Sequence, residues 1–96
     1  MPRSRIERIR EKIRLRQYDM TAHAAEEMAE DNLEIVDIEH AVLTGRVARI
    51  ERNDPRGSKY VVEGMATDGM AQVGVVGRFA SSGRYLIITV YEIAEK

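Results

Sequence analysis

The sequence predicts an α+β fold, in which three N-terminal helices pack on one face of a four-stranded antiparallel sheet. Up to Gly45 apolar residues recur every three or four positions, as on one side of a helix, whereas from Arg46 onward they recur every second position, as in strands. The strand connections are short, which requires antiparallel neighbours. The 96 residues are expected to form one domain, with a basic amphipathic helix over 1–17, helices over 18–45 and the sheet over 46–96.

The first helix is expected to begin after Ser4. The run from Ser4 to Glu7 fits a capping box, in which the two side chains bond to each other's backbone N–H groups. Ile6, Ile9 and Ile13 then form one apolar stripe, and basic side chains cover most of the remaining surface. Such a stripe belongs either to the protein's own core or to a seam with a partner. We expect this helix to mediate self-association, as in a homodimer, or to bind a partner protein.

A second helix is expected from Ala22 to about Asp31, with Thr21 as a favourable N-cap. Ala24 or Ala25 supplies its buried side together with Met28. The residues expected to face solvent are Glu26, Glu27 and Glu30.

A third helix is expected over about Val36–Leu43, with Ile38, Ala41 and Val42 facing the core. Gly45 is expected to end this helix in the left-handed conformation that glycine adopts at little cost.

The last of the four expected strands is predicted to lie inside the sheet. Its two alternating rows are both largely apolar or aromatic, which is typical of a strand covered on both faces. One row is Leu86, Ile88 and Val90, and the other is Tyr85, Ile87, Thr89, Tyr91 and Ile93. An Asp68-Gly69 pair predicts a hairpin turn before the third strand. The expected strands are Val47–Arg52, Lys59–Gly64, Met70–Phe79 and Arg84–Ile93.

Composition excludes several classes of protein. Cysteine is absent, which rules out disulfides, zinc–thiolate sites and a cysteine nucleophile. No apolar run approaches the roughly 18 residues of a membrane span, and no apolar segment follows the basic first residues as in a secretory signal. We therefore expect a cytoplasmic protein without membrane contact.

The net charge of −1 conceals an uneven distribution. Residues 1–17 carry seven bases against two acids, whereas residues 18–45 carry eight acids and no base. Residues 46–96 carry eight bases and six acids. Either the basic residues form a local patch for an anionic partner, or the basic and acidic segments pair with each other.

Three motifs in a fixed order resemble one small bacterial family. They are T-x-H-A-x-x-x-M from Thr21 to Met28, the stretch Asp37–Gly45, and the terminal run Ile87–Tyr91. Together they are similar to the domain-of-unknown-function family 4258, which is placed near the RelE, BrnT and MqsR-like toxins. In the commoner form of that family arginines occupy the positions of Glu27 and Asp31, so direct phosphate binding by this helix is less expected here.

The resemblance implies a helix-then-sheet, RelE/MqsR-like fold and a function. The function is that of a toxin in a type II toxin–antitoxin pair, a messenger-RNA interferase that cleaves RNA without metal. The implied partners are RNA and a cognate antitoxin with a zinc finger and a helix-turn-helix. The alternative is a non-catalytic protein-interaction domain of the same fold, which binds a partner through its acidic helical face or a sheet edge.

Metal-free RNA cleavage needs a base for the 2′-OH proton, an acid for the leaving 5′-oxygen and a cation for the phosphorane. His23 is the candidate acid or base, because imidazole titrates near neutrality. Arg78, in an otherwise apolar strand, is the candidate phosphate ligand, and Tyr91 would orient the 2′-OH or replace His23 as the acid. We expect these three catalytic side chains to meet at the helix–sheet seam. The substrate-binding candidates are Lys59, Arg84 and Thr89.

Each candidate also has a structural interpretation. His23 can bond a backbone or sheet group from the first turn of its helix, and Arg78 can pair with an acid of the second helix. Tyr91 and Thr89 can line a hydrophobic row, and Lys59 can be a solvated strand residue. The glycines form no nucleotide-binding pattern and the two histidines lack metal-ligand spacing, so no cofactor and no metal are expected.

Overall fold

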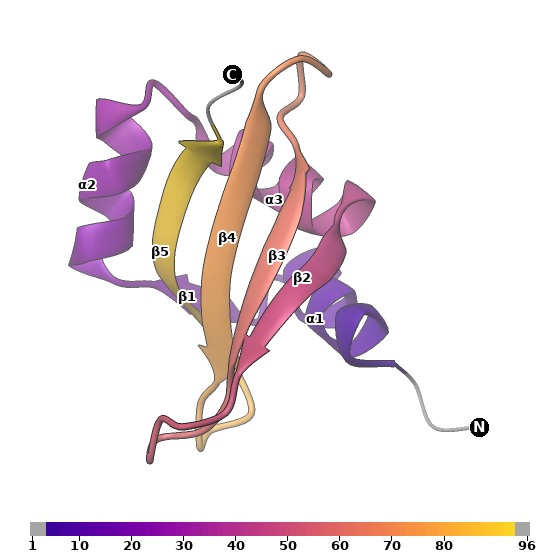
Figure 1. Ribbon diagram of the computed structural model, residues 1–96, viewed down its shortest axis with the longest axis vertical. Coiled ribbons are helices and arrows are strands. Elements are labelled where there is room, and N and C mark those ends of the chain that lie inside the picture. Colours follow the sequence, from indigo (N-terminus) through magenta and orange to yellow (C-terminus); the bar gives the residue numbers. More distant parts are fainter. Residues whose placement is uncertain (1–3, 94–96) are drawn as a thin grey trace.

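The computed structural model describes residues 4–93, which form three helices and one five-stranded sheet (Figure 1). None of these helices is long and apolar enough to cross a membrane. The helices are α1 (Arg5–Arg14), α2 (Ala22–Glu30) and α3 (Ile35–Thr44), and the strands are β1 (Tyr18–Met20), β2 (Arg46–Glu51), β3 (Lys59–Met65), β4 (Gln72–Phe79) and β5 (Tyr85–Ile93).

The sheet has the order β1-β5-β4-β3-β2 and is mixed. β2 to β5 form the expected antiparallel meander, whereas β1 pairs in parallel with Tyr85–Ile87 of β5. The prediction of four antiparallel strands, with no strand before Arg46, is therefore wrong. A strand of three residues is too short to show an alternating pattern in the sequence. The prediction that the last strand is internal is confirmed, since β5 lies between β1 and β4.

A β-bulge interrupts the pairing of β4 with β5. Val76 lies opposite Thr89, whereas Gly77 lies opposite Ile87, so Ile88 is the extra residue. The bulge shifts the alternation by one residue, and the two side-chain rows expected from the sequence are wrong. The β5 side chains buried in the core are Tyr85, Ile87 and Val90.

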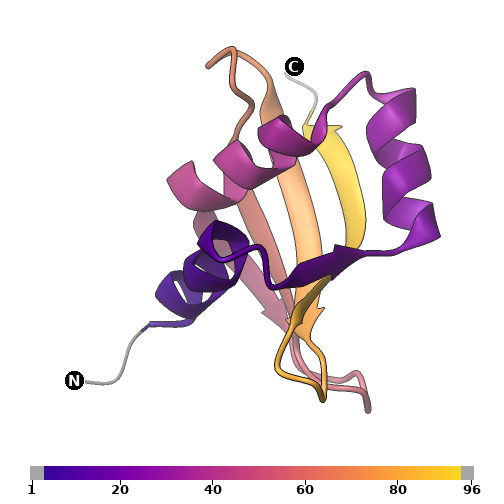
Figure 2. The same cartoon turned by 180° about the vertical axis from the view of Figure 1, so that it is seen from behind.

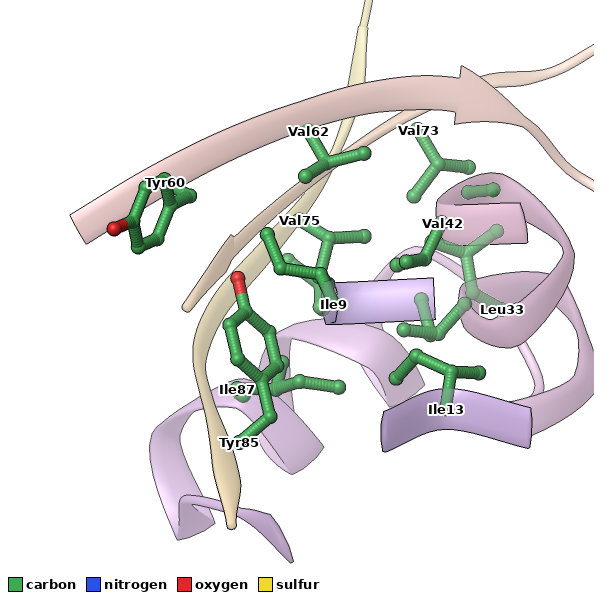
Figure 3. Close-up of a cluster of buried hydrophobic side chains, with 14 of the residues drawn as sticks. Ile9, Ile13, Leu33, Val42, Tyr60, Val62, Val73, Val75, Tyr85 and Ile87 are labelled. Atoms are coloured by element: carbon green, nitrogen blue, oxygen red, sulfur yellow. The ribbon is translucent and has the colours of Figure 1, made fainter. Parts of the chain in front are cut away.

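α1 and α3 cover one face of the sheet, and α2 lies beside the edge of β5 (Figures 1 and 2). α2 nevertheless buries Ala24 in the same core as α1 and α3, with Met28 packed against it, as expected from the sequence. Ile9 and Ile13 of α1 are fully buried in the core with residues of α3 and the sheet (Figure 3). The isoleucine stripe therefore packs within the protein's own core, and a partner at α1 would meet its basic surface instead.

The C-terminal end of α3 is held by α1. Arg10 donates from Nη2 to the carbonyl oxygen of Gly45 at 2.7 Å, and its Nε lies 3.5 Å from the carbonyl oxygen of Val42. Gly45 has φ −91° and ψ −169°, so the predicted left-handed cap is wrong. Glycine is required there because a Cβ would collide with the carbonyl oxygens of Ala41 and Glu63. A cation at this end also offsets the negative end of the helix dipole.

Replacing Arg10 by alanine should lower the free energy of unfolding by about 1–2 kcal/mol, because the carbonyl groups at the end of α3 lose their charged donor. Urea unfolding followed by circular dichroism measures this change. Arg14→Ala, at an exposed position of the same helix, is the control and should stay within about 0.5 kcal/mol of the parent. Equal losses of stability in the two variants would contradict this role of Arg10.

Tyr18 should make stability fall at alkaline pH. Its hydroxyl donates to Glu39 Oε2 at 2.7 Å, and burial together with this bond raises the pKa of Tyr18 to about 12. An unfolded tyrosine titrates near about 10. The stabilisation is therefore complete below pH 10 and is lost as the pH rises through 12. The melting temperature of the parent should drop toward that of Tyr18→Phe over this range, and parallel curves for the two proteins would refute the assignment.

Candidate functional site

The sheet face turned away from α1 and α3 is not covered by any helix of residues 4–93 (Figure 1). We call it the open face. Side chains alternate along a strand, so the neighbours of the buried Val62, Val73 and Val75 point to it. Val61 is fully buried without belonging to the helix-side core, which gives this face an apolar floor. The open face carries Val61, Glu63, Gly74, Val76, Arg78, Leu86, Thr89 and Tyr91.

Arg78 stands on the open face opposite Leu86 of β5. Its side chain is half-buried, and its Nε is buried without a hydrogen-bond partner in the described chain. No carboxylate of residues 4–93 forms an ion pair with it, so the alternative of a pair with an acid of α2 is not found. A buried donor without a partner costs about 1–3 kcal/mol. This cost would be relieved by an acceptor that reaches Nε.

Arg84, in contrast, is already engaged. Its Nε and Nη2 donate to the two carboxylate oxygens of Asp19 at 2.8 and 3.2 Å, and Nη2 also donates to the carbonyl oxygen of Tyr18 at 3.0 Å. The hydrogen bond from Arg84 lowers the pKa of Asp19. This bidentate pair joins β1 to the residue before β5. Arg84, predicted as a substrate ligand, therefore stabilises the pairing of these two strands.

Lys59 is engaged as well. Its Nζ lies 3.7 Å from Asp54 and 3.9 Å from Glu51. The backbone N–H and the side chain of Arg56 hydrogen-bond to Asp54 and lower the pKa of Asp54 to about 2, so this carboxylate stays charged near neutral pH. The arginines of β2 also have acidic partners, at Glu63 for Arg46 and at Glu51 for Arg49.

Thr89 and Tyr91 place two hydroxyl groups on the open face, whereas Tyr85, expected beside them, is buried on the helix side. Tyr91 lies opposite Gly74, and a Cβ at Gly74 would collide with the Tyr91 ring. The ring therefore lies across β4. Gly74 is four residues from Arg78, roughly 13 Å along the strand. Tyr91 and Arg78 share a face, but the backbone does not bring them into direct contact.

His23 lies in the first turn of α2, next to the β5 edge. Its side chain is 67% exposed, and its Nε2 is 3.3 Å from Glu27 Oε1. The same Glu27 oxygen accepts the backbone N–H of Val90 at 3.2 Å. Glu27 thus contacts both the imidazole and the backbone of β5, and with Nε2 against this carboxylate, Nδ1 is the ring nitrogen left to act as a base.

The acidic residues of α2 replace a neighbouring strand. β1 pairs only with Tyr85–Ile87, so the outer edge of β5 continues without a strand partner. There the hydroxyl of Thr21 donates to the carbonyl of Ile88, Glu27 accepts from Val90, and Asp31 accepts from the N–H of Glu92 at 3.1 Å. The prediction that Glu27 faces solvent is wrong, because it is one of the groups that complete this edge.

The candidate residues therefore follow one another from the outer edge of β5 toward β4. The His23–Glu27 pair lies beside β5, Thr89 follows on β5, and Arg78 stands on β4 two residues past the partner of Thr89. Glu27 was not among the predicted site residues, although its position four residues after His23 is the spacing of neighbours on a helix. No group of three or more acidic or histidine side chains within residues 4–93 is arranged to hold a metal ion.

Comparison with known proteins yields one match. The profile of a family described as a domain of unknown function, DUF4258, matches residues 20–92. No curated protein matches the chain, and no solved structure does. The matched stretch contains α2, α3 and nearly all of β2 to β5, and so includes the entire open face.

Glu27→Ala should lower the free energy of unfolding by about 1–2 kcal/mol, because the N–H of Val90 loses its acceptor at a partly buried edge. The matched control is Glu26→Ala, one residue earlier and exposed, which should change stability by less than about 0.5 kcal/mol. Chemical denaturation of both variants gives the comparison. If the two substitutions have the same effect, Glu27 does not complete the β5 edge.

Proposed function

The chain belongs to the DUF4258 family, and we propose that it is a metal-independent endoribonuclease with a RelE/MqsR-like fold. In this proposal it is the toxin of a type II toxin–antitoxin pair. The toxin assignment follows from the family resemblance of its motifs, and the site chemistry follows from the open face.

The observation that carries the proposal is the state of Arg78. Its Nε is buried on the open face and has no partner in the described chain. The neighbouring cations of the sheet, in contrast, have acidic partners. A guanidinium can donate two parallel hydrogen bonds to a phosphodiester, so an arginine of the sheet without an acidic partner is suited to hold one.

The proposed cleavage needs no group beyond those of this chain and the RNA. Nδ1 of His23 takes the proton of the 2′-OH, and the 2′-oxygen attacks the adjacent phosphorus. The bond from phosphorus to the 5′-oxygen breaks, and the imidazolium of His23 returns the proton to that oxygen. Tyr91 takes no part in this step, because its ring lies over Gly74, four residues along β4 from Arg78. Arg78 stabilises the negative charge of the phosphorane. The products are a 2′,3′-cyclic phosphate and a free 5′-hydroxyl.

The alternative is a non-catalytic interaction domain of the same fold. The observation that favours it is the acidic surface around His23, where Glu26 and Glu30 lie on the same helix and reach solvent. Like charges near a phosphodiester would oppose RNA binding at α2. In this alternative, the contacts of His23 and Glu27 only stabilise the outer edge of β5 and have no catalytic role.

A cleavage assay separates the two functions. The full chain is incubated with a 5′-labelled RNA in parallel samples with Mg²⁺ and with EDTA, and fragments with 2′,3′-cyclic phosphate ends are measured. His23→Ala should lower the rate about 10²–10⁴-fold, as expected for loss of an acid–base group. Arg78→Ala should lower it at least about 100-fold. Arg46→Ala, at an exposed arginine of the edge strand β2, is the control and should retain the parent's rate.

Melting temperatures of all variants accompany the assay. If the parent leaves RNA intact, and His23→Ala and Arg78→Ala change only the melting temperature, the ribonuclease proposal fails and the interaction domain stands. If EDTA abolishes cleavage by the parent, the metal-independent chemistry is wrong.

A further inference from the structure

The basic N-terminal segment and the acidic segment after it lie apart in the folded protein. Within residues 4–93, a single ion pair joins the basic N-terminal segment to the acidic segment after it, from Arg16 to Glu39 at 3.6 Å. α1 and α2 lie at opposite flanks of the sheet (Figure 2). The two segments therefore do not neutralise each other, and α1 presents Arg5, Arg8 and Arg14 to solvent although the net charge is −1.

A cleft of about 350 Å³ separates α1 from the turn between β4 and β5. The guanidinium carbon of Arg8 lies 4.6 Å from the centre of the Phe79 ring, a contact that fixes the charge over the aromatic face. On the same side of the helix, Lys12 Nζ donates to Gln17 at 3.3 Å and keeps further N–H donors. The cleft is lined chiefly by Arg8, Glu11, Lys12, Phe79, Ser81 and Gly83.

The cleft and the candidate site flank the same strand end. Phe79 follows Arg78 directly in β4, and consecutive strand residues point to opposite faces. Arg78 therefore faces the open side, while Phe79 faces α1. A single-stranded nucleic acid held at Arg78 would have to pass around the turn at Ala80–Gly83 to reach Arg8 and Lys12.

We propose that this cleft is a second anion site, in which Arg8 and Lys12 bind backbone phosphates of a single-stranded RNA away from the position of cleavage. The identity of the polyanion as RNA rests on the proposed function. A polyanion fits the cleft better than a protein surface does. None of the large exposed apolar residues of the described chain lines it, whereas protein interfaces usually have an apolar core.

The experiment measures binding without cleavage. A labelled 12-nucleotide 2′-O-methyl RNA lacks the attacking hydroxyl, and its affinity is followed by fluorescence anisotropy at several salt concentrations. The Arg8→Gln/Lys12→Gln double variant should bind on the order of tenfold more weakly at low salt. The slope of log affinity against log salt should become shallower by about 1.4, because two phosphates of a single strand are no longer neutralised. Arg14→Gln, exposed on another side of α1, is the control and should bind like the parent.

Combination with Arg78→Ala tests whether one strand occupies both sites. The losses of affinity should multiply, as for separate contacts to the same ligand. Equal losses for Arg14→Gln and the double variant, or no loss for either, would overturn the proposal. So would a change of mass in size-exclusion chromatography caused by the double variant without a change in RNA affinity, since that result identifies a protein-docking surface.

The same measurements distinguish this inference from the proposed function. Binding that depends on Arg8 and Lys12, without cleavage of ordinary RNA, would refute the ribonuclease and keep the second site. Cleavage that needs Arg78, with RNA affinity unaffected by the α1 substitutions, would refute the second site alone. Melting temperatures of the variants, with Arg8→Lys as a charge-preserving comparison, show whether removal of the cation from the Phe79 ring has unfolded α1.

Discussion

The outer edge of β5 is the constraint on which the arrangement of the protein depends. β5 supplies Tyr85, Ile87 and Val90 to the core, yet β1 pairs with only the first three residues along its outer edge. Backbone N–H and C=O groups at a partly buried edge must find partners. Thr21, Glu27 and Asp31 supply them, and α2 is therefore held at the edge instead of on the face. The same contacts bring His23 to the border of the open face.

Ion pairing divides the cations of this small protein into two groups. Those of the sheet and its turns are mostly joined to nearby acids, in pairs that fasten β1, β2 and the turn after β2. Arg78 lacks such a partner on the open face, and α1 keeps Arg8 at a cleft beside the end of the same strand. Net charge hides this division, so the capacity to bind an anion depends on how the cations are distributed over the structure and on which of them are joined to acids.

Local patterns of the sequence were sufficient for most of the fold. The switch of period at Gly45, the capping residues Ser4 and Thr21, and the Asp68-Gly69 turn each depend on neighbours within a few residues, and each lies where it was expected. β1 and the position of α2 depend instead on contacts between segments more than 60 residues apart in sequence. The bulge at Ile88 depends on the register between two strands. Periodicity along one segment contains none of this information.

The site divides in the same way. The sequence by itself determined which residues have suitable chemistry, because imidazole, guanidinium and hydroxyl groups are properties of the residue type. Only the tertiary structure decided which of them are available: it joined Arg84 to Asp19 and Lys59 to Asp54, fixed His23 against Glu27, and left Arg78 without a partner among residues 4–93. The physical reason is that an ion pair or an edge hydrogen bond requires two groups within about 4 Å, and that distance is set by the packing of distant segments rather than by local spacing.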